Sequence, residues 1–340
     1  MDWVLLAVAF VVILAGAELF TNGVEWVGEG FGLSEGAVGS VLAAVGTALP
    51  ETVLPFIAIL FSGGERGREI GTGAILGAPF MLTTLAMFVL GVAVLLPSRR
   101  RGRAELRGDR RVIRHDLAYF LGMYSLAVVA GLWHFTPYKV ALAVALVVGY
   151  GLYVRRHFAG SREDVVESEA AGEVRPLYFM RLRSRTVAGR VPPHWLSVIQ
   201  SLAALGLIIG GAKLFVDQVD VLAERLGVPR LAFALLLAPL ATELPEKFNS
   251  VIWVRRGKDT LALGNLTGAM VFQSSFPVTI GLLLTPWRLS NESLVAALVA
   301  LGAGLVLYTT LRRRGPLSGR LLLFHGLFYA GYVMYVITRL

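Results

Sequence analysis

Long stretches without a charged residue recur along the whole chain, and they constrain its fold more than any other feature. A helix needs about 20 apolar residues to cross a bilayer, and these stretches approach or exceed that length. The hydrophobic content of 56% and the mean hydropathy of +0.68 are typical of a polytopic membrane protein rather than a soluble domain. The six longest charge-free runs are residues 70–98, 117–138, 191–212, 260–287, 293–311 and 321–338.

Four further apolar segments bring the predicted number of transmembrane helices to ten. Two are short, at residues 3–17 and 140–154, and two contain acidic residues, near 36–64 and 231–254. The first segment has no basic residues before it, so we interpret it as a span and not as a cleaved signal peptide. The chain is therefore predicted to be an all-α polytopic membrane protein.

Positive charge is distributed unevenly between the predicted loops. The net charge of +9 could suggest a nucleic-acid partner. However, 23 of the 32 Lys and Arg residues lie in loops on one side of the ten-helix arrangement, and seven lie on the other. By the positive-inside rule, the basic side is cytoplasmic, so both termini lie on the outer side of the inner membrane. We therefore expect contact with lipid and none with nucleic acid. The basic loops are residues 99–114, 155–190, 255–258 and 312–320.

Two six-residue strings place carboxylates inside apolar segments and recur 195 residues apart. They are GTALPE, which ends at Glu51, and ATELPE, which ends at Glu246. A carboxylate at the bilayer centre costs about 2.5–3.5 kcal/mol on insertion scales, so it usually lines a polar pathway. Thr47 and Thr242 each lie four residues before the glutamate, and on a helix this spacing puts hydroxyl and carboxylate on one face.

Each string also contains a proline directly before its final glutamate. Pro50 and Pro245 lack an N–H group and displace the carbonyl four residues back, which frees the oxygens of Gly46 and Ala241. Hydroxyl, carboxylate and carbonyl oxygens are the ligands that a hard cation prefers. The strings therefore predict an ion site that is duplicated in the two halves of the chain.

The duplication extends beyond the two strings. Residues 16–51 and 211–246 align without a gap and are identical at 14 of 36 positions. Downstream, GAILGA at residues 73–78 matches GNLTGA at residues 264–269 after a four-residue insertion or deletion. The repeated unit therefore covers at least two helices and the start of a third.

An odd number of helices in each half determines how the halves are related. With five helices in the first half, the second enters the membrane from the opposite side, which produces an inverted repeat with its substrate near the midplane. We predict two inverted five-helix repeats at residues 1–154 and 195–340, joined by a hydrophilic cytoplasmic linker at residues 155–194.

These features resemble the two alpha-repeats of the sodium/calcium exchanger superfamily. The second repeat matches better, because ATELPE is followed by GNLTGAMVFQ at residues 264–273, which is similar to the family's G-N-x-x-G-S-N-x-x-N helix. The resemblance implies the same inverted ten-helix fold, with cation sites between helices 2, 3, 7 and 8. It also implies alternating access, in which helices 1 and 6 slide against that core.

The resemblance further implies roles for individual residues. Glu51 and Glu246 match the paired glutamates that bind calcium. Thr47 and Thr242 match threonines that contribute hydroxyl or carbonyl oxygens, and Asn265 matches an amide on helix 8.

The sequence departs from the family pattern at positions that bind sodium in the family. The serine after each threonine is Ala48 in the first repeat and Glu243 in the second, and the amide expected on helix 3 is Ala74. Lys247 follows the second glutamate, four residues after Glu243. Two interpretations stay open: the two side chains pair outside the site, or Lys247 replaces a cation that other members bind.

The sequence thus predicts a secondary active antiporter, not an enzyme, that exchanges Ca²⁺ for Na⁺ by alternating access and needs no cofactor. Exchange of Ca²⁺ for H⁺ is the main alternative, favoured by the missing sodium ligands. A non-transporting membrane paralogue and a membrane-embedded hydrolase with paired carboxylates are further alternatives, and the oligomeric state is left open. The candidate metal ligands are Thr47, Glu51, Thr242, Glu243, Glu246 and Asn265.

Overall fold

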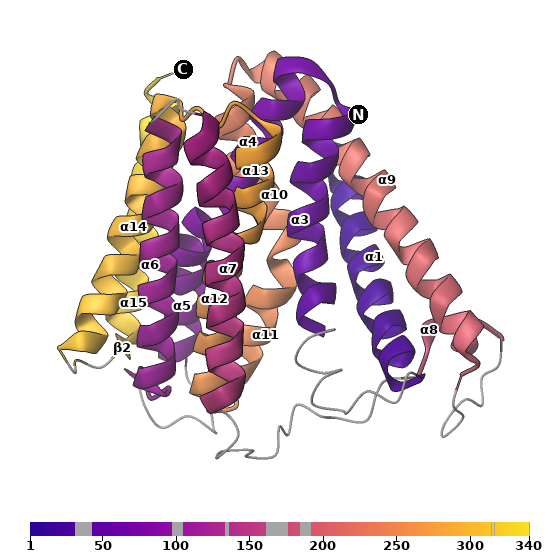
Figure 1. Ribbon diagram of the computed structural model, residues 1–340, viewed down its shortest axis with the longest axis horizontal. Coiled ribbons are helices and arrows are strands. Elements are labelled where there is room, and N and C mark those ends of the chain that lie inside the picture. Colours follow the sequence, from indigo (N-terminus) through magenta and orange to yellow (C-terminus); the bar gives the residue numbers. More distant parts are fainter. Residues whose placement is uncertain are drawn as a thin grey trace.

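The computed structural model is a bundle of helices that run up and down between two ends (Figure 1). It describes residues 1–30, 43–96, 105–132, 136–160, 176–183, 192–313, 315 and 317–339. The elements of the first half are α1 (Asp2–Gly30), α3 (Ala43–Phe61), α4 (Gly64–Met81), the π-helical turn η2 (Leu82–Ala86), α5 (Met87–Leu95), β1 (Glu105–Leu106), α6 (Arg110–Leu132) and α7 (Thr136–Gly160). They are followed by α8 (Tyr178–Arg183), α9 (His194–Leu226), α10 (Arg230–Thr242), α11 (Leu244–Arg255), α12 (Asp259–Gln273), α13 (Phe276–Leu284), α14 (Asn291–Arg312), β2 (Leu317–Ser318) and α15 (Gly319–Ile337).

Eight helical segments of the described chain are long and apolar enough to cross a membrane. Two of them combine successive elements, with α4, η2 and α5 in Gly64–Leu95 and α12 and α13 in Asp259–Leu284. Two shorter apolar helices, Pro50–Phe61 and Arg230–Leu240, belong to the elements that carry the motif strings. The prediction of a helical polytopic membrane protein is confirmed, whereas within the described residues eight segments rather than ten have the length and hydropathy of a full span.

Three of the predicted basic loops meet at one end of the bundle. Strands β1 and β2 pair antiparallel, which joins the chain before α6 to the chain before α15. The N–H of Arg107 donates a 2.7 Å hydrogen bond to Asp259 at the start of α12. The chain termini lie at the opposite end (Figure 1), where Arg225 at the end of α9 forms an ion pair with Asp2. This shared end is the arrangement that the charge asymmetry predicts for these loops.

The contact between α1 and α9 is two-fold symmetric. A Cβ atom at Gly16 would lie 2.8 Å from Cγ1 of Ile208, and one at Gly211 would lie 2.9 Å from Cγ1 of Ile13. The two glycines and the two isoleucines are each separated by 195 residues, the offset of the aligned repeats. Because glycine carries no side chain, the two long helices can approach closely at these points.

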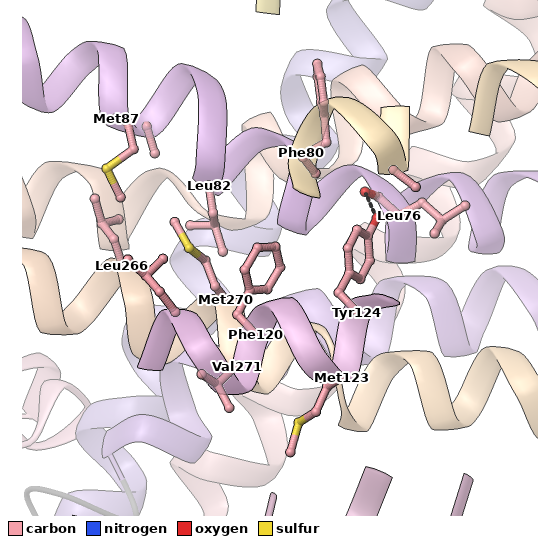
Figure 2. Packing of buried hydrophobic residues seen from close by; sticks show 14 of the residues in the cluster. Leu76, Phe80, Leu82, Met87, Phe120, Met123, Tyr124, Leu266, Met270 and Val271 are labelled. Carbon is pink, nitrogen blue, oxygen red and sulfur yellow. Dashed lines mark hydrogen bonds between the residues drawn. The ribbon is translucent and has the colours of Figure 1, made fainter. Parts of the chain in front are cut away.

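The larger apolar core lies where α4, η2 and α5 meet α6, α12, α14 and α15. Figure 2 shows Phe120 and Met270 packed together there beside Leu82. The hydroxyl of Tyr124 donates a 3.3 Å hydrogen bond to the carbonyl oxygen of Leu76. These contacts hold α4 in place, and α4 in turn packs against α10 from the second half of the chain.

Part of the predicted linker is packed against the bundle. Helix α7 continues to Gly160, and α8 forms within the linker. The N–H of Tyr178 donates to Oδ1 of Asn22 at 3.1 Å, and its hydroxyl donates to Glu18 at 2.8 Å. The start of α8 is therefore bound to α1, and residues 161–175 and 184–191 of the linker lie outside the described residues.

Candidate functional site

The second motif string lies at a break between two helices. Helix α10 ends at Thr242, and Glu243 separates it from α11 with φ −93° and ψ 7°. Pro245 follows in the first turn of α11, where its missing N–H is tolerated. The N–H of Glu243 still donates to the carbonyl of Pro239 at 3.1 Å, and the N–H of Lys247 donates to the carbonyl of Glu243 at 3.2 Å. The break is therefore one residue wide.

The first motif string lies in an unbroken helix. Helix α3 continues through Pro50 and Pro55. Glu51 is only 7% exposed although it lies on a helix with no basic residue of its own. Burial of an ionised carboxylate among apolar groups is costly, so a cation or a proton is favoured beside it.

Glu51 and Thr242 line the same buried crevice, one from each half of the chain. The crevice is too narrow, as it stands, to hold a water molecule. Its hydroxyl and carboxylate are the polar side chains in an otherwise apolar lining. The other lining residues are Leu54 and Pro55 of α3, Ala74 and Ala78 of α4, and Ala238 and Pro239 of α10.

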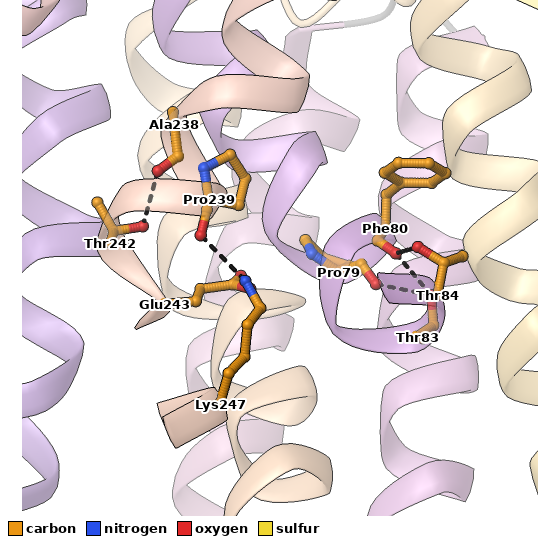
Figure 3. A network of polar contacts seen from close by, with 9 residues as sticks. All are labelled: Pro79, Phe80, Thr83, Thr84, Ala238, Pro239, Thr242, Glu243 and Lys247. Atoms are coloured by element: carbon orange, nitrogen blue, oxygen red, sulfur yellow. Dashed lines mark hydrogen bonds and ion pairs between the residues drawn. The ribbon is translucent and has the colours of Figure 1, made fainter. Parts of the chain in front are cut away.

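Glu243 and Lys247 form a buried ion pair beside this crevice (Figure 3). The Nζ atom of Lys247 lies 3.1 Å from Oε2 of Glu243, and the two side chains are 7% and 1% exposed. Nζ also donates to the carbonyl oxygen of Pro239 at 3.2 Å. That oxygen belongs to the C-terminal turn of α10, where helix carbonyls carry partial negative charge. The ammonium therefore stabilises a carboxylate and a helix end together.

The remaining predicted ligands have different surroundings. The hydroxyl of Thr242 donates to the carbonyl of Ala238 at 3.2 Å, which leaves its oxygen able to coordinate a cation. Asn265 is partly buried and donates to Oγ of Ser250 at 3.1 Å, so it joins α12 to α11. It is absent from the described lining of the crevice. Thr47 and Glu246 lie in α3 and α11, but their side chains lie outside the described residues.

A buried carboxylate that the sequence analysis does not single out lies on α6. Asp116 is 1% exposed and accepts hydrogen bonds from the hydroxyls of Thr267 at 2.7 Å and Tyr153 at 3.1 Å. It therefore joins α6 to α12 and α7. Because the charge-free run begins one residue later, the sequence suggests a loop at this point. The buried stripe of Ile113, Asp116 and Phe120 has helical spacing, and this is the signal that could reveal it.

A second cluster of buried polar groups supports the π-helical turn η2. Thr83 and Thr84 direct their hydroxyls back to carbonyls of the preceding turn, from Pro79 and Phe80 (Figure 3). Nδ1 of His325, on α15, lies 2.8 Å from the carbonyl oxygen of Thr83. These bonds satisfy backbone groups that an irregular helix leaves exposed within the bundle.

A larger hollow of about 640 Å³ lies at the connection between α3 and α4. Its lining is charged and includes Glu65, Glu69, Arg66 and Arg230. Asp220 of α9 forms ion pairs with both arginines, at 3.1 Å from Arg66. This hollow is at the surface and its described lining does not include Glu51, so we place the candidate site at the crevice of Glu51 and Thr242. Within the described side chains, no three acidic or histidine groups gather closely enough to hold a metal ion.

A comparison with protein families matches almost the whole chain. The family described as "Sodium/calcium exchanger protein" matches residues 1–158 and 196–340. Among curated proteins, the inner membrane protein YrbG of Escherichia coli (strain K12) is 24% identical over 334 residues. That alignment covers 93% of this chain and 90% of YrbG.

Two solved structures with different exchange chemistry have the same fold. The H⁺/Ca²⁺ exchanger CAX is 17% identical with a TM-score of 0.71, and the match covers 99% of this chain and 86% of that chain. The sodium-calcium exchanger NCX_Mj is 18% identical with a TM-score of 0.56, and the match covers 98% of each chain. At these identities the likeness shows the fold and not the transported ions.

Proposed function

Because the chain belongs to the sodium/calcium exchanger family, we propose that it is a secondary active antiporter that exchanges Ca²⁺ for a monovalent cation. The observation that carries the proposal is the crevice between the two halves, which the buried Glu51 and Thr242 both line. A carboxylate and a hydroxyl from different helices can bind a cation only while those helices stay together. Binding and helix movement are therefore coupled at this point.

In the proposed site, Glu51 and Glu246 supply the charge that a divalent cation requires. Oxygens of Thr47 and Thr242 and carbonyl groups of the proline-containing helices complete the coordination, since Ca²⁺ takes about six to eight oxygen ligands. The crevice widens to admit the ion. Two monovalent cations, or two protons on the carboxylates, replace one Ca²⁺, and this mutual exclusion produces exchange.

The proposed topology is the ten-helix inverted repeat, with residues 1–154 and 195–340 as its halves. It is supported by the two short motif helices beside the eight full-length segments and by the symmetric contact of α1 with α9. Both termini lie outside and the linker lies in the cytoplasm. A cysteine introduced at Ser161 should react only with membrane-permeant reagents in intact cells, and reaction with an impermeant reagent would contradict this orientation.

The driving ion is proposed to be Na⁺, with H⁺ as the second candidate. The argument for H⁺ is that Ala48 and Ala74 stand where the family has a hydroxyl and an amide that bind sodium. The fold is compatible with both, since solved exchangers of each kind match it.

Flux measurements on purified protein in proteoliposomes test the proposal. Uptake of radioactive calcium should require an imposed outward gradient of Na⁺ or of H⁺ and should stop when an ionophore dissipates that gradient. Glu51→Gln should abolish uptake, whereas the exposed control Glu224→Gln should keep it. Calcium uptake that is independent of both gradients, or normal uptake by Glu51→Gln, would refute the proposed function.

A further inference from the structure

A positively charged side chain is held beside the proposed cation site. The ammonium of Lys247 contacts a carboxylate oxygen of Glu243 at 3.1 Å and the carbonyl oxygen of Pro239 at 3.2 Å. Carboxylate and backbone carbonyl oxygens are also the ligands that hard metal cations take in proteins. The ammonium thus has the surroundings of a bound monovalent cation.

This ammonium adjoins the crevice of the candidate site. Pro239 lines the crevice with Glu51, and its carbonyl oxygen accepts the hydrogen bond from Lys247. Thr242, the other polar lining residue, directly precedes Glu243 in the chain. Figure 3 shows Thr242 and Glu243 at the break between α10 and α11, with Lys247 one turn further along α11. A charge at this position acts on any ion in the crevice through a medium of low dielectric constant.

We propose that Lys247 is a tethered cation that permanently replaces one transported monovalent cation, so that calcium exchange by this chain moves no net charge. This inference rests on the proposed function. Three carboxylates, of Glu51, Glu243 and Glu246, belong to the two strings, and Lys247 offsets one of their charges. The two charges that remain match one Ca²⁺ or two monovalent cations. Glu243 then belongs to the tethered cation and is not a ligand of the transported ion.

A purely structural role for the pair explains less. The first repeat has Ala48 and Thr52 at the positions equivalent to Glu243 and Lys247, and α3 is unbroken there. The pair therefore accompanies the helix break, but a neutral hydrogen-bonding group could satisfy a carbonyl equally well. Buried ion pairs are often no more stabilising than apolar side chains of similar size. Charge balance in the site supplies a reason for a charged pair.

The test compares calcium accumulation at zero and at imposed membrane potential, in proteoliposomes with a fixed monovalent gradient. The wild-type protein should reach the same accumulation ratio at every potential. Lys247→Met keeps the length of the side chain but removes the charge, so an extra monovalent cation should enter the site. One uncompensated charge then moves in each cycle, and the ratio should change by up to about 50-fold per 100 mV, which corresponds to about 2.3 kcal/mol.

A double variant separates charge balance from stability. Glu243→Gln with Lys247→Met removes both charges and restores the balance of the wild-type site. It should transport more slowly, because the Pro239 carbonyl keeps the N–H of Glu243 but loses the Lys247 ammonium as a donor. Its accumulation ratio should again be independent of potential. If the ion pair had only a structural role, every folded variant would keep the wild-type response of calcium accumulation to the membrane potential.

Each result has a definite meaning. Absence of calcium flux from the wild-type protein would refute the proposed function itself. Wild-type flux with a potential-dependent ratio would overturn the tethered-cation inference alone, even if Lys247→Met did not fold. A folded Lys247→Met variant with wild-type coupling would overturn it as well, and so would a double variant with potential-dependent coupling.

Discussion

The two motif helices share a sequence string but differ in structure. Helix α3 continues through Leu-Pro-Glu, whereas the same three residues follow a break between α10 and α11. A proline in this string is therefore insufficient to break the helix. The second repeat differs by polar groups that satisfy the end of α10, since Lys247 donates to the carbonyl of Pro239. The residues Pro239, Glu243 and Lys247 correspond to Ala44, Ala48 and Thr52 in the first repeat.

The helices that follow the strings also differ. On α4, Cβ atoms at Gly73 and Gly77 would lie 2.4 Å and 2.1 Å from carbonyl oxygens of α10. At the equivalent Gly264 of α12 there is open space, and at Gly268 the nearest atom is the hydroxyl of Tyr153 at 3.7 Å. The α1–α9 contact is symmetric, as its paired glycines show, whereas the packing around the site is not. The repeats thus share a scaffold and have diverged where the ions are proposed to bind.

The largest expected effect is the loss of calcium transport when a motif glutamate is neutralised. Comparing the two glutamates tests whether the strings remain equivalent in function despite this divergence. Glu246→Gln should reduce calcium transport at least about 100-fold, as Glu51→Gln should, because either change removes half of the charge that balances a dication. Flux in proteoliposomes, with Glu224→Gln as the exposed control, measures this. Transport at more than half the wild-type rate by Glu246→Gln would show that only the first string binds the ion.

A smaller effect is expected on stability, where the two glycine-rich helices should differ. Gly73→Ala places a methyl group against a backbone oxygen and should destabilise the protein by about 1–3 kcal/mol. Gly264→Ala meets open space and should be neutral or slightly stabilising, because alanine favours a helix more than glycine does. Thermal unfolding of both variants in detergent measures the difference. Equal melting temperatures would mean that the two helices are packed alike.

The smallest effect should be the same in both repeats. Gly16→Ala and Gly211→Ala each introduce a methyl group 2.8–2.9 Å from Cγ1 of an isoleucine and 3.1–3.2 Å from the backbone nitrogen of that isoleucine, so the facing helix must move slightly in both cases. Each change should lower stability by less than about 1.5 kcal/mol, and the two values should agree within about 0.5 kcal/mol. Thermal unfolding again provides the measurement. A clear difference between these variants would argue against a two-fold relation of α1 and α9.

Much of the architecture could be predicted from apolar runs, because a membrane-spanning helix must satisfy its backbone internally. The lengths of the helices were harder to predict from the sequence. The charge-free run that ends at residue 212 predicts a shorter helix than α9, which continues to Leu226. It continues because Phe215, Val219 and Leu222 extend the buried stripe, whereas Lys213 faces outward. A charged residue therefore ends an apolar run without ending the helix.

The site could be predicted in part. The strings indicated Glu51 and Thr242, and the structure places both in one crevice. The Glu243–Lys247 pair follows from its four-residue spacing, but its position beside the crevice depends on the helix break, which no local signal specifies. Asp116 was missed because its partners, Thr267 and Tyr153, are distant in sequence. Contacts between helices decide whether such a carboxylate is buried.

Equilibrium binding of radioactive calcium to the purified protein tests the central claim most directly. The wild-type protein should bind one Ca²⁺ per chain, and Na⁺ or protons should compete with it. Glu51→Gln should elute and unfold as the wild type does but should bind calcium at least about 100-fold more weakly, since an amide cannot balance the charge of a dication. Calcium binding of wild-type affinity by a folded Glu51→Gln variant would contradict the assignment of the crevice as the cation site.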